Sequence, residues 1–312
     1  MTNFNTSLLI DLDKCVINAL EFFADANTKF PAFNVNKYTR PLVVGSGNAA
    51  ATGKILFEGK DAVFADESTF EAKLQSIKNI DGIFLISASG GKHAPAIAET
   101  AKKYNLEVEL LTCNPNSAAA DKVGNTLVFP SLPEPYTYNT STYMAMILAA
   151  TAENPAQTAG DILEHIKNST DPYLQAANTD FAGFDAFFVL VPEAFDLIRI
   201  MMQTKFVELF GRKIARDVFT FEQAKHATTV VQAEKELFLS FGDRESLWGK
   251  DKLTVALPKN TGYAGIMAVG YYVIGKIQAQ KPQWFKESIP DYAEKASEMF
   301  GQTITPIVNF KQ

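Results

Sequence analysis

Small hydroxyl residues and glycines follow a buried apolar run at residues 83–92. The sequence there is I-F-L-I-S-A-S-G-G-K, in which Ser87, Ser89 and Gly90 come directly after four apolar residues, and a helical pattern follows. Hydroxyl groups, free backbone N–H groups and the positive end of a helix dipole attract anions, and Lys92 adds a full charge. The pattern fits a pocket for phosphate, although serine and glycine are also common in ordinary strand-to-helix turns.

A second glycine-rich turn, G-S-G-N-A-A, lies earlier in the chain between a short apolar run and a helical pattern. It begins with Gly45, Ser46, Gly47 and Asn48. The turn fits G-x-G-x-x-A, and Asp66 follows at the spacing of a dinucleotide-binding fingerprint, which taken alone predicts a Rossmann oxidoreductase using NAD or NADP. Two such turns in neighbouring strand–helix units also fit one small phosphorylated ligand shared between strand ends, which explains both.

The composition argues against several classes of protein. With 312 residues, 47% hydrophobic and 21% charged, the chain is expected to form a well-packed globular protein with room for two domains. A net charge of -6 disfavours a nucleic-acid surface, because phosphate neutralisation needs clustered lysine and arginine. Two cysteines and three separated histidines show no disulfide or metal-site pattern. Neither a signal peptide nor a membrane-spanning run is visible, which predicts a cytoplasmic protein without membrane contact.

Alternating strands and helices are expected to position the two turns. In the first half, strands are predicted at 42–44, 61–65, 83–86, 108–112 and 126–129, with helices between them. In the second half, strands are predicted at 186–191, 237–241, 253–257 and 304–308, and a buried helix at 266–277. Such alternation is typical of α/β proteins with doubly wound, mainly parallel sheets in three αβα layers. The polar segment 153–159 is the expected linker between domains 1–154 and 155–312.

In order and spacing, these motifs resemble the sugar isomerase (SIS) domain family. That family combines a G-x-G-[ST] turn, a strand ending in S-x-S-G-x-T, a T-N-x-x-x-S segment and an E-x-x-V-A-S-T-K helix start. The matching stretches here are 45–48, 86–92, 112–121, 134 and 141–143, with Lys92 where the family has threonine. The resemblance implies two flavodoxin-like SIS domains, the second degenerate, and one sugar-phosphate site per chain. The implied binding residues are Gly45, Ser46, Gly47, Asn48, Ser87, Ser89, Gly90, Lys92, Ser141 and Thr142.

The second half resembles the second SIS domain of double-domain enzymes such as the isomerase part of glucosamine-6-phosphate synthase and the phosphoglucose/phosphomannose isomerases. In those enzymes a catalytic glutamate lies on a long helix, with a histidine shortly after it. Glu208 and His226 hold the corresponding places here, and Lys286 falls in a segment like the family's C-terminal tail. The resemblance implies these three as catalytic residues. It also implies a homodimer with sites near the interface, in which His226 serves its own or the neighbouring chain's pocket.

Aldose–ketose isomerisation gives these residue types a role. A carboxylate such as Glu208 moves a proton between adjacent carbons, and a histidine such as His226 assists ring opening near neutral pH. A rigidly held phosphate sets the register of the carbon chain, and no metal or organic cofactor is needed. Deamination or deglycation of a sugar phosphate would use the same proton transfer.

Several alternatives remain open at this point. Glu208 is equally interpreted as a solvated helix residue paired with Lys205 or Arg212, and His226 as a surface side chain. His93 is expected to face solvent. A sugar-phosphate-binding regulator without catalysis is the alternative to an enzyme, and the Rossmann oxidoreductase is the third hypothesis.

Overall fold

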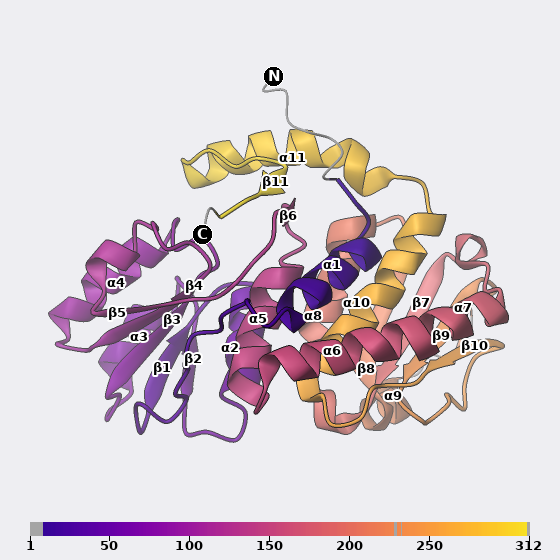
Figure 1. The fold of residues 1–312 in the computed structure, drawn as a ribbon, viewed down its shortest axis with the longest axis horizontal. Coiled ribbons are helices and arrows are strands. Elements are labelled where there is room, and N and C mark those ends of the chain that lie inside the picture. Colours follow the sequence, from indigo (N-terminus) through magenta and orange to yellow (C-terminus); the bar gives the residue numbers. More distant parts are fainter. Residues whose placement is uncertain (1–8, 228–229, 232, 311–312) are drawn as a thin grey trace.

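Two parallel sheets flank a central layer of helices (Figure 1). The computed structural model describes residues 9–227, 230–231 and 233–310. The first sheet has the strand order β2-β1-β3-β4-β5, with β1 (Pro41–Val44), β2 (Val63–Ala65), β3 (Gly82–Ile86), β4 (Val108–Thr112) and β5 (Asn125–Val128). The second has the order β10-β9-β7-β8, with β7 (Ala186–Val191), β8 (Ala215–Thr220), β9 (Glu236–Phe241) and β10 (Asp251–Val255).

Both sheets are wound in the same way. Every neighbouring pair in them is parallel. In each sheet the chain starts at an inner strand, β1 or β7, moves to its neighbour on one side, and then continues on the other side. The predicted α/β class with doubly wound parallel sheets in three layers is therefore confirmed.

The helices connect these strands, and several of them fill the space between the sheets (Figure 1). They are α1 (Leu12–Ala24), α2 (Asn48–Leu56), α3 (Phe70–Ser76), α4 (Ala94–Lys103), α5 (Thr140–Thr151), α6 (Pro155–His165), α7 (Asp171–Ala177), α8 (Ile198–Phe210), α9 (Phe221–Ala227), α10 (Gly262–Gln280) and α11 (Trp284–Phe300). Short 3-10 helices lie at η2 (Ala120–Lys122), η4 (Phe181–Gly183) and η5 (Glu193–Phe195), and the π-helical segment η3 (Ile166–Thr170) joins α6 to α7.

Strand β1 shows why the apolar runs have no polar alternation. Val43 packs into the central core between the sheets, whereas Leu42 and Val44 pack on the opposite face, against a cluster that includes residues of α3 and α4. Both faces of the strand are buried, as is usual for parallel sheets covered by helices. A continuous apolar run is therefore what this position requires.

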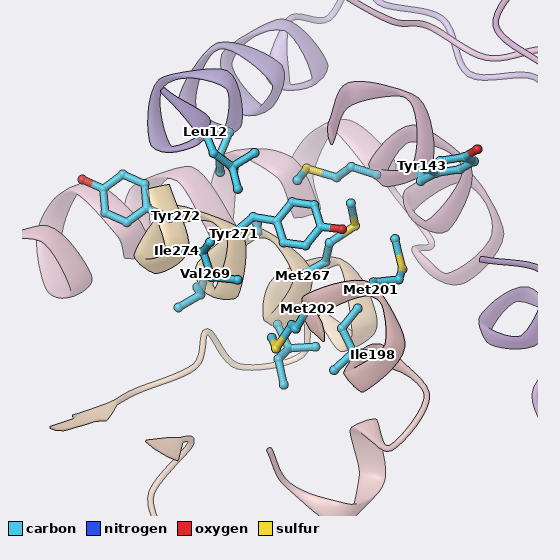
Figure 2. Packing of buried hydrophobic residues seen from close by; sticks show 14 of the residues in the cluster. Leu12, Tyr143, Ile198, Met201, Met202, Met267, Val269, Tyr271, Tyr272 and Ile274 are labelled. Carbon is cyan, nitrogen blue, oxygen red and sulfur yellow. The ribbon is translucent and has the colours of Figure 1, made fainter. Parts of the chain in front are cut away.

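Helix α10 is the centre of the molecule, and Figure 2 shows its packing. Tyr271 is fully buried, and Met267 lies beside Met201 and Met202 of α8. A Cβ atom at Gly275 would lie 2.0 Å from the backbone nitrogen of Asp13, so only glycine allows α1 to cross this close. The predicted burial of residues 266–277 is confirmed.

Three segments differ from the expected elements. Strand β8 has no counterpart among the predicted strands, because it is an edge strand whose charged residues interrupt the apolar pattern. Of the predicted strand 304–308, only β11 (Ile307–Val308) forms, antiparallel to β6 (Glu134–Pro135). Residues 155–159 of the expected linker form the start of α6, and the division of the chain at residue 154 stays a prediction.

The C-terminal part of the chain returns to the first half. Helix α11 and strand β11 lie over the side of the first sheet where β6 emerges (Figure 1). Among the described residues, no helix is long and apolar enough to cross a membrane.

Candidate active site

A cavity of about 500 Å³ opens at the carboxyl ends of β1 and β3. These strands are neighbours, and the chain leaves them toward opposite edges of the sheet. Ligands of doubly wound proteins bind at such a switch point. Eight of the residues predicted from the sequence line this cavity: Gly45, Ser46, Gly47, Asn48, Ser87, Ser89, Lys92 and Glu208.

The turn after β1 brings the start of α2 to the cavity. Gly47 has φ +57°, a conformation that favours glycine. The Ser46 hydroxyl donates to a carboxylate oxygen of Glu67, which also lines the cavity. Asn48 is 7% exposed, and its side-chain oxygen has no hydrogen-bond partner within the described part of the chain. Burying an amide oxygen without a hydrogen-bond donor costs free energy. A ligand hydroxyl that donates to the Asn48 oxygen would remove this cost.

The loop after β3 is held from behind by the segment that follows β4. The Thr112 hydroxyl donates to the carbonyl of Ala88 at 2.9 Å, and the Asn114 amide donates to the carbonyl of Ser89 at 3.1 Å. The N–H of Ala119 donates to the carbonyl of Gly90 at 3.0 Å. Thr112, Asn114 and Ala119 thus hold the loop from one side, and its other side lines the cavity.

The two serine hydroxyls of this loop keep a proton to donate. Ser87 Oγ accepts from the N–H of Gly90 at 3.2 Å, and Ser89 Oγ accepts from the N–H of Gly91 at 3.3 Å. Because the serine oxygen is the acceptor in both bonds, each hydroxyl hydrogen can turn toward an anionic oxygen in the cavity. The predicted anion-binding loop therefore has the geometry to donate two hydrogen bonds.

Replacing Gly90 by alanine is expected to destabilise this loop. Gly90 has φ +59°, and a Cβ atom there would lie 2.3 Å from Ser117 Oγ, so both backbone and packing would have to shift. We expect a loss of about 1–3 kcal/mol in the free energy of unfolding, measured by denaturant titration. Gly124→Ala is the control, because a Cβ atom at Gly124 has nothing within 4 Å. Equal stability of the two variants would contradict this prediction.

Lys92 joins the loop to the C-terminal segment. Its Nζ donates to Tyr136 Oη at 3.0 Å and lies 3.9 Å from the centre of the Phe300 ring. Its N–H donates to Gln302 Oε1 at 3.3 Å, and burial lowers the pKa of the ammonium group. Lys92 has φ +52°, which is uncommon for a residue other than glycine. The ammonium group lines the cavity while it rests against aromatic rings.

Glu208 reaches the cavity from α8, where Lys205 positions it. Lys205 is fully buried, and its Nζ donates to Glu208 Oε2 and to the carbonyls of Thr137 and Tyr138, each at 2.7 Å. All three ammonium protons are therefore used. Burial raises the pKa of Glu208, and the Lys205 charge partly opposes this effect. Lys205 therefore holds one oxygen of the Glu208 carboxylate, and the side chain lines the cavity.

Ser141 and Thr142 lie at the start of α5, and neither is among the residues that line the cavity. The carboxylate of Glu134 accepts from the N–H of Thr140 at 2.8 Å, and from the N–H and hydroxyl of Ser141 at 3.2 and 2.9 Å. Burial raises the pKa of Glu134. An internal carboxylate therefore occupies this helix start, where the resemblance implied contact with the ligand.

Three further residues predicted for the site are not among those that line the cavity: Gly90, His226 and Lys286. Gly90 adjoins the lining, and His226 is exposed on α9. Lys286 lies on α11 and pairs with Asp11, with 2.9 Å between Nζ and Oδ1. His93, which we expected to face solvent, is exposed and lines the cavity, with its ring centre 6.5 Å from that of Phe300.

Sequence reasoning missed the wall that covers the cavity. It comes from the C-terminal segment 302–310 and from three tyrosines, Tyr136, Tyr143 and Tyr292. Burial raises the pKa of Tyr136, and the negative charge of Glu208 adds to this effect. No local motif marks Tyr136, Tyr292 or the segment 302–310, because they meet only when α11 folds back over the first half. Tyr143 lies in the matched stretch 141–143, where the family has lysine. Among the described residues, no cluster of three metal-binding side chains is present.

No protein-family model matches the chain, and no curated protein matches its sequence. Solved structures do match its fold. Glucosamine-6-phosphate deaminase from Thermotoga maritima has a TM-score of 0.60 at 15% identity, covering 86% of this chain and 92% of that one. Tagatose-6-phosphate ketose/aldose isomerase from Escherichia coli has 0.58 at 14%, covering 96% and 91%.

The C-terminal domain of glucosamine-fructose-6-phosphate aminotransferase from Francisella tularensis also matches, with a TM-score of 0.54 at 13% identity, covering 88% of this chain and 94% of that one. Identities this low establish a shared fold. The structural neighbours are phosphosugar isomerases and related sugar-phosphate proteins, so the resemblance seen in the motifs is confirmed at the level of the fold.

Proposed function

We propose that the protein binds a sugar phosphate in this cavity and transfers a proton next to its carbonyl group. The observation that carries this proposal is that two hydroxyl donors and a partly buried carboxylate line one cavity at the switch point of a parallel sheet. Ser87 and Ser89 would hold the phosphate, and Glu208 would act as the base. Isomerisation, or the related deamination or deglycation, is the reaction class.

In this proposal, one end of the cavity binds the phosphate and the other end carries out the proton transfer. The phosphate would sit at the end of β3, beside the hydroxyl groups of Ser87 and Ser89, and this anchor would set the position of the carbon chain. Glu208 would then remove a proton from the carbon beside the carbonyl and return it to the adjacent carbon. His93 would assist ring opening within one chain, and His226 would do so for a neighbouring chain in a homodimer.

A ligand screen tests this function directly. We expect hexose phosphates to raise the unfolding temperature of the protein, and the ligands that do so to be converted in an assay for the ketose or for released amine. Unphosphorylated sugars provide the control. Absence of any stabilising sugar phosphate would contradict the proposal.

Replacing both serines, Ser87→Ala with Ser89→Ala, is expected to weaken binding of the selected sugar phosphate by at least about tenfold, because each charge-assisted hydrogen bond contributes about 1.5–3 kcal/mol. Isothermal titration measures the dissociation constant. Ser76→Ala is the matched control, because the Ser76 hydroxyl bonds only within α3, to the carbonyl of Ala72. An unchanged dissociation constant in the double variant would place the phosphate elsewhere.

Binding without turnover is the second candidate function. The observation that favours it is the position of His226, which is exposed on α9 and absent from the described lining of the cavity. Tight binding of a hexose phosphate with no conversion by the assembled protein would support a regulatory role.

A further inference from the structure

The second sheet has a switch point equivalent to the one that forms the cavity. β7 lies between β8 and β9, just as β1 lies between β2 and β3. The carboxyl ends of these strands lead to Glu193 after β7, Glu222 after β8, and Arg244 after β9. In the first sheet, the turns after β1 and β3 carry glycines and serines that line a cavity, and the turn after β2 adds Glu67.

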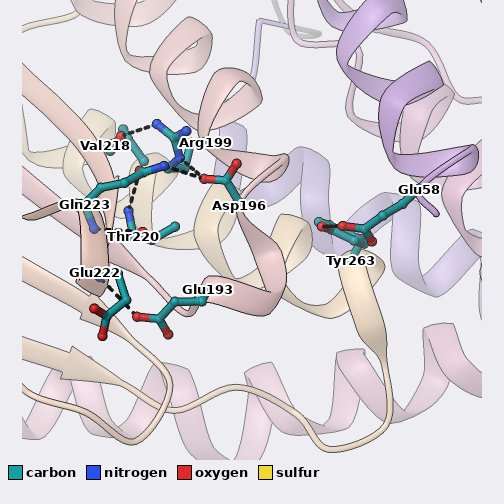
Figure 3. Close-up of polar contacts among 9 residues, drawn as sticks. All are labelled: Glu58, Glu193, Asp196, Arg199, Val218, Thr220, Glu222, Gln223 and Tyr263. Atoms are coloured by element: carbon teal, nitrogen blue, oxygen red, sulfur yellow. Dashed lines mark hydrogen bonds and ion pairs between the residues drawn. The ribbon is translucent and has the colours of Figure 1, made fainter. Parts of the chain in front are cut away.

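The carboxylate of Glu193 occupies the second switch point. Its two oxygens each lie 3.0 Å from Nη1 of Arg244. Oε1 also accepts from the N–H of Glu222 at 3.1 Å (Figure 3). The guanidinium carbon of Arg244 lies 4.3 Å from the centre of the Phe221 ring, which orients the group. An arginine and a backbone N–H converging on two oxygens are the contacts that a phosphate or sulfate would also receive.

Neighbouring side chains hold these turns in place independently of Glu193. Gln223 and Thr220 exchange two hydrogen bonds, and Gln223 Nε2 donates to Asp196 Oδ1 at 3.0 Å. Arg199 donates to the same oxygen at 2.7 Å and to the carbonyl of Val218 at 3.3 Å (Figure 3). The turn that presents the Glu222 N–H should therefore stay in position when the Glu193 carboxylate is removed, and the Phe221 ring remains beside the Arg244 guanidinium.

We propose that the second switch point is an anion site whose occupant is the chain's own Glu193, and that it accepts inorganic phosphate or sulfate once this carboxylate is removed. The Glu193 carboxylate is tethered to the chain, so it competes with free anions for Arg244 and the Glu222 N–H at an effective concentration of about millimolar or above. Free anions that bind weakly are therefore excluded. The ion pair is open to solvent, with 48% of the Arg244 side chain and 40% of the Glu193 side chain exposed, so a free anion can reach it. This inference stands independently of the proposed activity.

The test uses the full chain with the first cavity disabled by Ser87→Ala and Ser89→Ala. In this parent, we expect Glu193→Ala to tighten the binding of inorganic phosphate, measured by isothermal titration, by about tenfold or more, since the internal competitor is removed. Adding Arg244→Ala should abolish the gain. Glu193→Gln, which removes the charge and keeps the size, should produce a smaller gain of the same sign.

Two results would overturn the proposal. One is an unchanged phosphate affinity in both Glu193→Ala and Glu193→Gln, and the other is a gain that survives Arg244→Ala. Circular dichroism and the unfolding transition establish whether each variant is folded. If Glu193→Ala is not folded, the phosphate affinity of Glu193→Gln decides between the outcomes. Since inorganic phosphate is the probe, failure here leaves the sugar-phosphate screen of the first cavity unaffected.

Discussion

Glu208→Gln is expected to lower the turnover of the accepted sugar phosphate by about 10²–10⁴-fold, which is the usual contribution of a positioned general base. The amide has nearly the same size as the carboxylate but cannot take up the proton. The dissociation constant of the substrate should change little, because the proposed phosphate donors, Ser87 and Ser89, are unchanged in this variant. Steady-state kinetics and isothermal titration together separate the two effects.

Glu99→Gln is the matched control for this change. Glu99 lies on α4, where its carboxylate pairs with Lys122 at the surface, outside the described cavity lining. We expect this variant to keep full turnover. Equal turnover in Glu208→Gln and the original protein would remove Glu208 from the mechanism, whatever the sugar.

The pH dependence of kcat/KM provides a further check on the same residue. Burial raises the pKa of Glu208 above the ordinary glutamate value of about 4.3, so the carboxylate takes up a proton at a higher pH than usual. Because the base must be ionised, activity should fall as pH decreases through this raised pKa. An acid limb at or below the ordinary glutamate value would contradict this expectation.

Lys205→Met is expected to produce the largest loss of stability, about 3–5 kcal/mol in the free energy of unfolding, as when one partner of a buried ion pair is removed. The methionine fits the volume, but it leaves the Glu208 carboxylate and the carbonyls of Thr137 and Tyr138 without their donor. Denaturant titration measures the loss. The pKa of Glu208 should rise further, so the acid limb of the activity profile should move to higher pH.

Lys225→Met is the control for the lysine change. Lys225 pairs with Glu222 at the same i,i+3 spacing, but 56% of each side chain is exposed. Exposed pairs of this kind contribute less than about 1 kcal/mol, so the control should be nearly neutral. A loss of similar size in both variants would show that the burial of Lys205 has no special effect. If Lys205→Met does not fold at all, the stability of Glu208→Gln, which keeps the lysine, reports on the same pair.

The parallel sheets and the serine- and glycine-containing turn after β3 were predictable because their determinants are local. Apolar runs such as 83–86 reflect strands with two buried faces, and the hydroxyl and glycine residues after them reflect the turn that joins strand to helix. Strand β8 was not predictable in this way, because an edge strand tolerates charges that break the pattern. The scarcity of charged residues in α10 predicted its burial, which the structure confirms.

The candidate site was likewise predictable only in those features that depend on local sequence. The positions of Ser87, Ser89 and Glu208 on their elements were predictable, and the structure brings them to one cavity. Whether a hydrogen-bond donor remains available to a ligand depends on its surroundings. Ser141 matches the helix-start motif of the family, but the structure engages its N–H and hydroxyl with Glu134. Lys205 gave only an i,i+3 spacing to Glu208, which does not distinguish a solvated pair from a buried one.

By itself, the sequence determined the alternation of strands and helices and the chemistry of the turns at 45–48 and 87–92, since periodicity and turn preferences act over a few residues. Only the tertiary structure decided that α11 and the segment 302–310 cover the cavity, that Lys92 rests against Phe300, and that Glu193 fills the second switch point. These contacts join segments far apart in the chain, so burial and charge pairing there depend on the completed fold.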